Sequence, residues 1–187
     1  MTPVTVQIQT KLKDALNVAI NMRVEERYED ALNYMESVRG FFEEDELYMG
    51  RFGCGLGVTR LRMGHLREAI EEYEKAYGLL IKHDEAEAAV VLGNIADAYV
   101  ELNQIPDAHS YLDRAEAILK NHSEIWYAER RETRARAYLK SGHIDDARDA
   151  ISEAVSILEH GFEERALNEA KATHRLCFES LGEERWA

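Results

Sequence analysis

The sequence contains four glycines within eight residues, Gly50, Gly53, Gly55 and Gly57, and such a motif could indicate a nucleotide-binding loop. A glycine-rich loop can hold a nucleotide phosphate when a strand precedes it and a helix starts after it. Here the flanking apolar residues recur with helical spacing, and no Lys-Ser or Lys-Thr pair follows the glycines. We predict that the glycines lie inside a helix, where they allow close packing and leave the helix locally flexible.

Other residue types that could carry catalysis are scattered. The seven histidines form no HExxH, HxH or His/Cys cluster, and no Ser-His-Asp or Cys-His arrangement can be assembled. Cys54 and Cys177 are far apart and form no CxxC motif, so free thiols are expected. We predict no catalytic residues, no bound metal and no cofactor, and therefore a protein that is not an enzyme.

Composition limits the choice of partner and compartment. The 187 residues carry a formal net charge of −13, with 45% hydrophobic residues, 32% charged residues and only two prolines. An acidic chain disfavours nucleic acid as the main partner, because a phosphate backbone needs a basic surface. The N-terminus lacks a signal-peptide pattern, and no stretch of 18 apolar residues occurs. We expect a cytoplasmic, helical protein without membrane insertion.

An internal repeat of about 39 residues organises the chain. A small residue recurs in the second helix of each expected helix pair: Ala31, Ala69, Ala108 and Ala147. A turn residue recurs between the two helices of a pair: Gly64, Asn103, Gly142 and Gly182. Two independent markers with nearly the same period predict successive helical hairpins.

Apolar residues at helical spacing predict nine helices. Their expected bounds are 6–24, 26–39, 46–63, 66–82, 85–102, from about 106, 123–140, 144–159 and 162–181. Pro106 suits a first helical turn, and Ser123 can cap the helix that follows it. Glu26 stands where later repeats carry Gly or Asn, so the first inter-helix turn is expected to be irregular.

The repeat residues resemble those of the tetratricopeptide repeat (TPR) family. They are Leu56, Gly57, Gly64, Ala69, Tyr73 and Ala76 in the second repeat, Tyr99, Ala108 and Ala115 in the third, and Tyr138, Gly142, Ala147 and Ala154 in the fourth. The period exceeds the usual 34 residues, as in longer TPRs of bacterial regulatory proteins. The resemblance implies an all-α, right-handed superhelix of four hairpins plus a fifth first helix, about nine helices, in one domain over residues 1–187. The repeats would span 6–44, 45–83, 84–122 and 123–161.

Two arginines interrupt the apolar stripes, because Arg60 and Arg134 stand where other repeats carry tyrosine or an aliphatic residue. Each must pair with a carboxylate, reach water along its stem, or contact a ligand; a structural role is favoured. The aromatic pairs Phe41-Phe42 and Trp126-Tyr127 either staple the hairpins together or form a patch for self-association, and stapling is favoured.

The resemblance also implies a concave groove, lined by the first helix of each hairpin, that accepts an extended peptide or a helix. Repeat alignment places eight polar residues on it: Lys13, Asn17, Arg51, Asn94, Asp97, Glu129, Thr133 and Arg136. The side chains of these residues either bind a partner or are only solvated. The lysine and asparagine pattern by which co-chaperone TPRs grip a C-terminal carboxylate is absent in either register.

The leading functional prediction is a non-enzymatic module, regulatory or scaffolding and bacterial in type, that binds a protein or peptide. The alternative is a sensory or dimerisation input domain fused to a cyclase, kinase or DNA-binding output domain beyond Ala187. The helix over 162–181 either caps the array or is followed by more protein, and the unpaired Trp186 favours the second reading. Trp186 is the residue predicted for self-association, and a homodimer that depends on it would favour the input-domain alternative.

Overall fold

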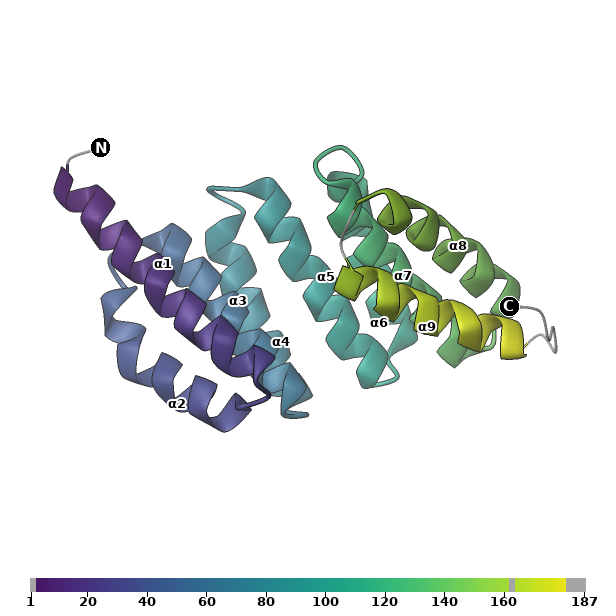
Figure 1. The fold of residues 1–187 in the computed structure, drawn as a ribbon, viewed down its shortest axis with the longest axis horizontal. Coiled ribbons are helices and arrows are strands. Elements are labelled where there is room, and N and C mark those ends of the chain that lie inside the picture. The colour runs from purple at the N-terminus through teal and green to yellow at the C-terminus, as the bar shows by residue number, and fades with distance from the viewer. Residues whose placement is uncertain (1–2, 162–163, 181–187) are drawn as a thin grey trace. The chain divides into compact units, whose positions relative to one another are not determined.

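The computed structural model describes residues 3–161 and 164–180, which are helical throughout apart from short turns (Figure 1). The described elements are α1 (Pro3–Val24), α2 (Tyr28–Val38), the 3-10 helix η1 (Arg39–Phe41), α3 (Glu46–Arg62), α4 (Leu66–Leu80), α5 (Glu85–Glu101), α6 (Ile105–Leu119), α7 (Glu124–Ser141), α8 (Ile144–Gly161) and α9 (Glu164–Ser180). The predicted all-α fold of consecutive helix pairs is confirmed. None of these helices has the length and apolar character that a membrane span requires.

The chain divides into two compact units, Met1–Val91 and Leu92–Ala187. In the first unit, α1 packs on α2 and α3 packs on α4. Its core contains Leu12, Ala19, Met35, Phe42, Phe52 and Leu56. The rings of Phe42 and Phe52 lie 4.7 Å apart between centroids, so Phe42 staples the link after α2 to α3, whereas Phe41 is 72% exposed.

In the second unit, α7 packs on α8 and α9 packs on both. Its core contains Ala147, Ala150, Ile151, Ala154, Leu158, Ala166, Ala170 and Cys177. The rings of Tyr99 and Tyr111 stack at 5.4 Å and join α5 to α6. The four repeat alanines, Ala31, Ala69, Ala108 and Ala147, are all fully buried, which explains why a small residue recurs at that position. The single-domain organisation of residues 1–187 stays a prediction.

Close packing accounts for the glycine run of α3. A Cβ atom added at Gly57 would lie 2.4 Å from Cε1 of Tyr73 on α4, and one at Gly50 would lie 2.7 Å from Cγ of Leu80. The predicted position of the glycines inside a helix, against a close neighbour, is confirmed. Their effect on the flexibility of α3 stays a prediction.

Local capping follows the residues that the sequence offers. The Ser123 hydroxyl accepts a hydrogen bond from the Trp126 backbone N–H at 3.3 Å, and Asp45 caps α3 in the same way through the Tyr48 N–H at 3.1 Å. Pro106 lies in the first turn of α6. The two predictions for Pro106 and Ser123 are confirmed.

The turn inside each hairpin is closed by a residue in the left-handed conformation. The φ angles are 80° at Gly64, 58° at Asn103, 79° at Gly142 and 59° at Glu26. In each turn the next residue donates its backbone N–H to the carbonyl five positions back, for example Arg27 to Met22 at 2.9 Å and His65 to Arg60 at 2.9 Å. The prediction of an irregular first turn is therefore wrong. Glu26 adopts the same backbone as its glycine counterparts, which is why α2 begins only at Tyr28.

Replacing Glu26 with glycine should raise the free energy of unfolding by about 0.5–1 kcal/mol. A side chain makes the left-handed conformation costly, and glycine removes that cost although it adds freedom to the unfolded chain. Urea denaturation followed by circular dichroism measures the change. The reverse substitution, Gly64→Glu, is the matched comparison and should destabilise the protein. An equal or lower stability of Glu26→Gly would contradict this account of the turn.

Candidate functional site

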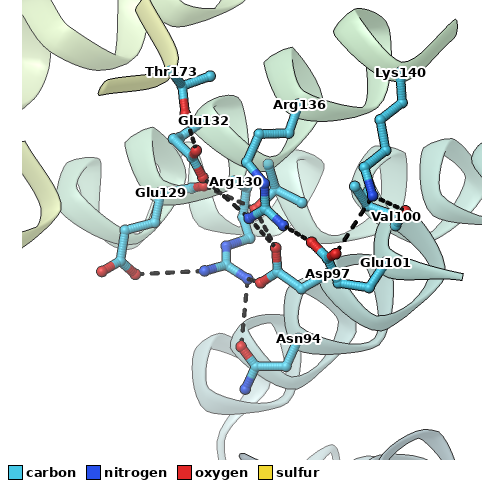
Figure 2. Close-up of polar contacts among 11 residues, drawn as sticks. Asn94, Asp97, Val100, Glu101, Glu129, Arg130, Glu132, Arg136, Lys140 and Thr173 are labelled. Atoms are coloured by element: carbon cyan, nitrogen blue, oxygen red, sulfur yellow. Dashed lines mark hydrogen bonds and ion pairs between the residues drawn. The ribbon is translucent and has the colours of Figure 1, made fainter. Parts of the chain in front are cut away.

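Five of the eight residues predicted to line the groove lie together in the second unit, and Figure 2 labels all of them except Thr133. Asn94 and Asp97 come from α5, and Glu129, Thr133 and Arg136 come from α7. Asp97 is the centre of the group. Its carboxylate accepts hydrogen bonds from the Thr133 hydroxyl at 2.8 Å and from Nη1 of Arg136 at 3.2 Å.

Sequence reasoning missed the most buried charged member, Arg130, whose side chain is 8% exposed. Its Nη1 lies 3.4 Å from both Asn94 Oδ1 and Asp97 Oδ2, and its Nη2 lies 3.6 Å from Glu129 Oε2. Gly93 makes room for it, since a Cβ there would lie 2.1 Å from Cδ of Arg130. The sequence did contain a signal for Arg130. It is a charged residue one repeat after Val91, at a position where the repeat pattern is apolar.

Further contacts join α7 to α9 and to α5 (Figure 2). Glu132 accepts a hydrogen bond from the Thr173 hydroxyl of α9 at 2.7 Å. Arg136 reaches Glu101 of α5 at 2.5 Å, and Lys140 donates to the carbonyl oxygen of Val100 at 2.9 Å. The α5–α7 polar cluster is defined here as Asn94, Asp97, Glu101, Glu129, Arg130, Glu132, Thr133, Arg136, Lys140 and Thr173.

Charges within this cluster are nearly balanced, with four carboxylates and three cations. Burial raises the pKa of Glu132, although the nearby Arg136 opposes the shift. Burial lowers the pKa of Arg136, but Asp97, Glu132 and Glu101 outweigh it, and the net direction is upward. The cluster can therefore present hydrogen-bonding groups in fixed positions without a strong field of one sign.

Glu132→Gln should change how stability depends on pH. The pKa of Glu132 is raised on folding, so between its unfolded and folded pKa values the folded chain holds a proton that the unfolded chain has lost. This contribution to stability is complete below the unfolded pKa and is lost as the pH rises through the folded pKa.

The glutamine variant lacks this titration. The unfolding free energy of the wild type minus that of Glu132→Gln should fall as the pH rises, by about 1.4 kcal/mol for each unit of pKa shift. Urea denaturation of both proteins from about pH 4 to pH 8, a range that begins below the ordinary glutamate pKa of 4.5, measures the difference. A difference that stays constant or rises with pH would contradict the raised pKa.

The other three predicted residues belong to the first unit. Lys13 and Asn17 are exposed on α1. Arg51 of α3 forms two hydrogen bonds with the Glu87 carboxylate of α5, at 2.5 and 2.8 Å, and its guanidinium lies 5.1 Å from the centre of the Tyr48 ring. Arg51 is thus already paired, whereas Lys13 and Asn17 present their side chains to solvent.

The two arginines on apolar stripes are paired with carboxylates, as the sequence favoured. Arg134 contacts Asp113 at 2.7 Å and Glu116 at 2.8 Å, and Arg60 contacts Glu68 and, at 3.8 Å, Glu36. Their positions are explained by ion pairing within the fold.

On α7, the Tyr127 hydroxyl donates to Glu153 of α8 at 3.1 Å, a contact within one hairpin, and Trp126 is 37% exposed, so stapling between hairpins by this pair stays a prediction. Trp186 lies outside the described residues. Both cysteines are free thiols, and burial raises the pKa of Cys177. Within residues 3–161 and 164–180, no group of three or more His, Cys, Asp or Glu side chains is placed to hold a metal ion.

Comparison with known proteins gives the same fold. Residues 52–121 match the family model of the tetratricopeptide repeat. Among solved structures, BtubC (BKLC) from P. vanneervenii has a TM-score of 0.77 at 16% identity, with 96% of this chain and 76% of that chain covered.

Two further structures show the same arrangement of helices. Bacillus thuringiensis PlcR, in complex with the peptide PapR7 and DNA, has a TM-score of 0.66 at 14% identity, covering 93% of this chain and 71% of that one. MamA (41-end) from Desulfovibrio magneticus RS-1 has a TM-score of 0.58 at 16% identity, covering 92% of each chain. A search of curated proteins found no match.

Proposed function

We propose that this chain, whose residues 52–121 carry tetratricopeptide repeats, is a non-enzymatic module that binds a peptide segment or helix of a partner protein. The candidate binding residues are Lys13, Asn17 and Arg51 on the first helices of the first unit, and the α5–α7 polar cluster in the second unit. The role proposed for the module is regulatory or scaffolding, in the cytoplasm of a bacterium.

The observation that carries this proposal is the fixed geometry of the α5–α7 polar cluster. Asp97 contacts Thr133, Arg136 and Arg130, and further cluster residues contact both arginines, so these side chains lose little freedom when a partner binds. The outer parts of the cluster remain accessible, since Arg136 is 31% and Glu101 43% exposed. Asn94 adds an amide, which can both donate to and accept from a peptide backbone.

The fold-level likeness to PlcR gives further support. PlcR was solved in complex with the peptide PapR7 and DNA, so a protein that contains this fold binds a peptide. The likeness is one of fold, and the proposal for this chain depends on the named residues of its own first helices.

Selection from a displayed library of random peptides tests this function directly. The tightest peptides would be titrated by calorimetry against the wild type, Asn94→Ala and the double variant Asn17→Ala with Asn94→Ala. Losing an amide contact to the peptide should weaken binding about tenfold per site. Asn121→Ala, which changes an exposed asparagine in the turn after α6, is the matched control and should bind as the wild type does.

Circular dichroism would show that each variant keeps its helices. Full affinity in the double variant, with its helicity intact, would remove the first helices as the binding surface. A library that yields no peptide bound by the wild type would count against peptide recognition as the function.

The same PlcR structure also contains DNA and favours a second candidate, a sensory or dimerisation input domain joined to an output domain. In that case a selected peptide should change the association of the chain as well as bind it. Light scattering at saturating peptide measures the mass, and an unchanged mass would count against the input-domain function.

A further inference from the structure

Arg23 is a half-buried cation that no carboxylate of the described residues neutralises. It lies in the last turn of α1, one turn beyond the buried Ala19. The equivalent positions of the later repeats are apolar: Leu61, Val100 and Leu139. Within the described residues, its side chain contacts a backbone carbonyl and a thioether, and no carboxylate oxygen lies within ion-pair distance.

This lack of a counter-charge sets Arg23 apart from the other arginines of the chain. Every other arginine that is buried or half-buried in the described residues has a carboxylate oxygen within 3.4 Å, as Arg39 has that of Glu36. Carboxylates are not scarce, since the chain has 36 acidic residues for 23 lysines and arginines. Arginine stays protonated at neutral pH, and a charge partly removed from water costs free energy until it is paired.

The guanidinium of Arg23 has one edge in contact with the protein and one open edge. Its Nη1 donates to the Gly55 carbonyl oxygen of α3 at 3.4 Å and lies 3.9 Å from Sδ of Met35 on α2. Its Nε and Nη2 have no hydrogen-bond partner among the described residues, and neither atom is enclosed, so both are open to solvent. Burial lowers the pKa of Arg23, and the groups that oppose the shift, Cys54 and Tyr73, are a thiol and a phenol.

Gly55 leaves space beside this guanidinium. A Cβ atom added at Gly55 would lie 3.5 Å from Nη1 of Arg23 and 3.0 Å from Cε at the flexible end of Met35. The equivalent position of the third repeat carries Asn94, whose Oδ1 accepts a hydrogen bond from Arg130 at 3.4 Å. The third repeat thus supplies a side-chain acceptor to an arginine at a position where the second repeat supplies none.

The same space lies beside a candidate binding residue. Gly55 follows Arg51 by four residues, about one turn of α3, so the two positions share a face of the helix. A peptide that runs along this face passes the guanidinium of Arg23. We propose that Arg23 and the space left by Gly55 form a subsite that binds the carboxylate of an aspartate or glutamate side chain of the bound peptide. This inference rests on the proposed function and adds a chemical requirement for its ligand.

A carboxylate is the group that fits the open edge. The N–H donors of Nε and Nη2 form the fork that arginine uses to bind both oxygens of a carboxylate. One guanidinium balances one negative charge, whereas a phosphate group carries nearly two and would meet the repulsion of a chain with net charge −13. A peptide that continues past Arg51 and Gly55 presents a side chain there rather than its C-terminus.

A carboxylate supplied by the chain itself tests whether Arg23 accepts one. Gly55→Asp places a carboxylate beside Arg23, and Gly55→Asn has the same shape without the charge. The urea midpoint of Gly55→Asp should be higher than that of Gly55→Asn, and the two midpoints should agree when each is combined with Arg23→Gln. Equal midpoints with Arg23 present would mean that the guanidinium is only hydrated, and would overturn the subsite.

Peptides selected with the wild type test the ligand. Each acidic residue of the tightest peptide is replaced in turn by its amide and titrated by calorimetry. One replacement should weaken binding to the wild type about tenfold and leave binding to Arg23→Gln nearly unchanged. Arg62→Gln is the matched control, since it removes the same charge from an exposed position near the end of α3 and should respond to the replacement as the wild type does.

The outcomes separate this inference from the proposed function. Peptides that bind the wild type, but have no acidic residue whose effect depends on Arg23, would overturn the subsite and leave peptide binding in place. A dependence on Arg23 that disappears when the peptide C-terminus is amidated would overturn the assignment to a side chain. If the wild type selects no peptide, the proposed function fails and this inference fails with it. Circular dichroism checks that every variant keeps its helices.

Discussion

Replacing Asp97 with alanine should lower the free energy of unfolding by about 3 kcal/mol, because it removes one side of a largely buried group of charges. Asp97 is the shared partner of Arg130, Arg136 and Thr133. Without the carboxylate, the nearly buried Arg130 keeps only Asn94 at 3.4 Å and Glu129 at 3.6 Å. Arg136 loses one of its carboxylate partners and keeps Glu101 and Glu132. Removing a partner from a largely buried group of charges costs more free energy than removing one from an exposed ion pair.

The series Asp97→Asn and Asp97→Ala separates charge from hydrogen bonding. Asparagine keeps an acceptor for the Thr133 hydroxyl and for one arginine, so it should cost about half as much as alanine. Asp149→Ala on the exposed surface of α8 is the matched control and should change the unfolding free energy by less than about 0.5 kcal/mol. Urea denaturation measures all three, and equal small effects at both aspartates would show that the cluster adds nothing to stability.

The substitution Gly57→Ala should lower the free energy of unfolding by about 2 kcal/mol, since the new methyl group would overlap a fully buried aromatic ring. A Cβ there would lie 2.4, 2.5 and 2.9 Å from three atoms of the Tyr73 ring. A ring is rigid, so either Tyr73 leaves its rotamer or α3 moves away from α4. Alanine is the better helix former by about 1 kcal/mol, and this gain offsets only part of the overlap.

Gly78→Ala is the control for Gly57→Ala, because Gly78 also lies within a helix but a Cβ there has nothing within 4 Å. It should raise the free energy of unfolding by about 0.5–1 kcal/mol. Opposite signs for the two variants in thermal and urea denaturation are the expected result. A stabilising effect of Gly57→Ala would mean that α3 and α4 do not pack closely at this point.

The repeat could be read from the sequence because its markers are local. Ala69, Ala108 and Ala147 recur at a constant period. Gly64 and Gly142 predict left-handed turns, because glycine adopts a positive φ easily. Glu26 adopts the same left-handed backbone conformation, but glutamate does not predict it, since only the geometry of the hairpin imposes it. Local residue type predicted the turns that glycine or asparagine forms and failed at the one formed by glutamate.

The candidate site could be predicted in part. Repeat alignment identified Asn94, Asp97 and Thr133, which do lie together, because equivalent positions of successive first helices are neighbours. Arg130 was missed since its place in the repeat is apolar, and its burial depends on Gly93, which belongs to the preceding first helix. Gly93 has no side chain and so leaves space for the long side chain of Arg130 on another helix. Neither helix sequence shows this pairing by itself.

The contacts that tie successive first helices have one more consequence, for how the chain folds. They join residues 32 to 41 positions apart, as in Arg23 with Gly55, Arg51 with Glu87, and Glu132 with Thr173. Loops of this length close at little entropic cost, so each contact can form once the next hairpin exists. The protein can therefore acquire its structure hairpin by hairpin while the ribosome is still making it.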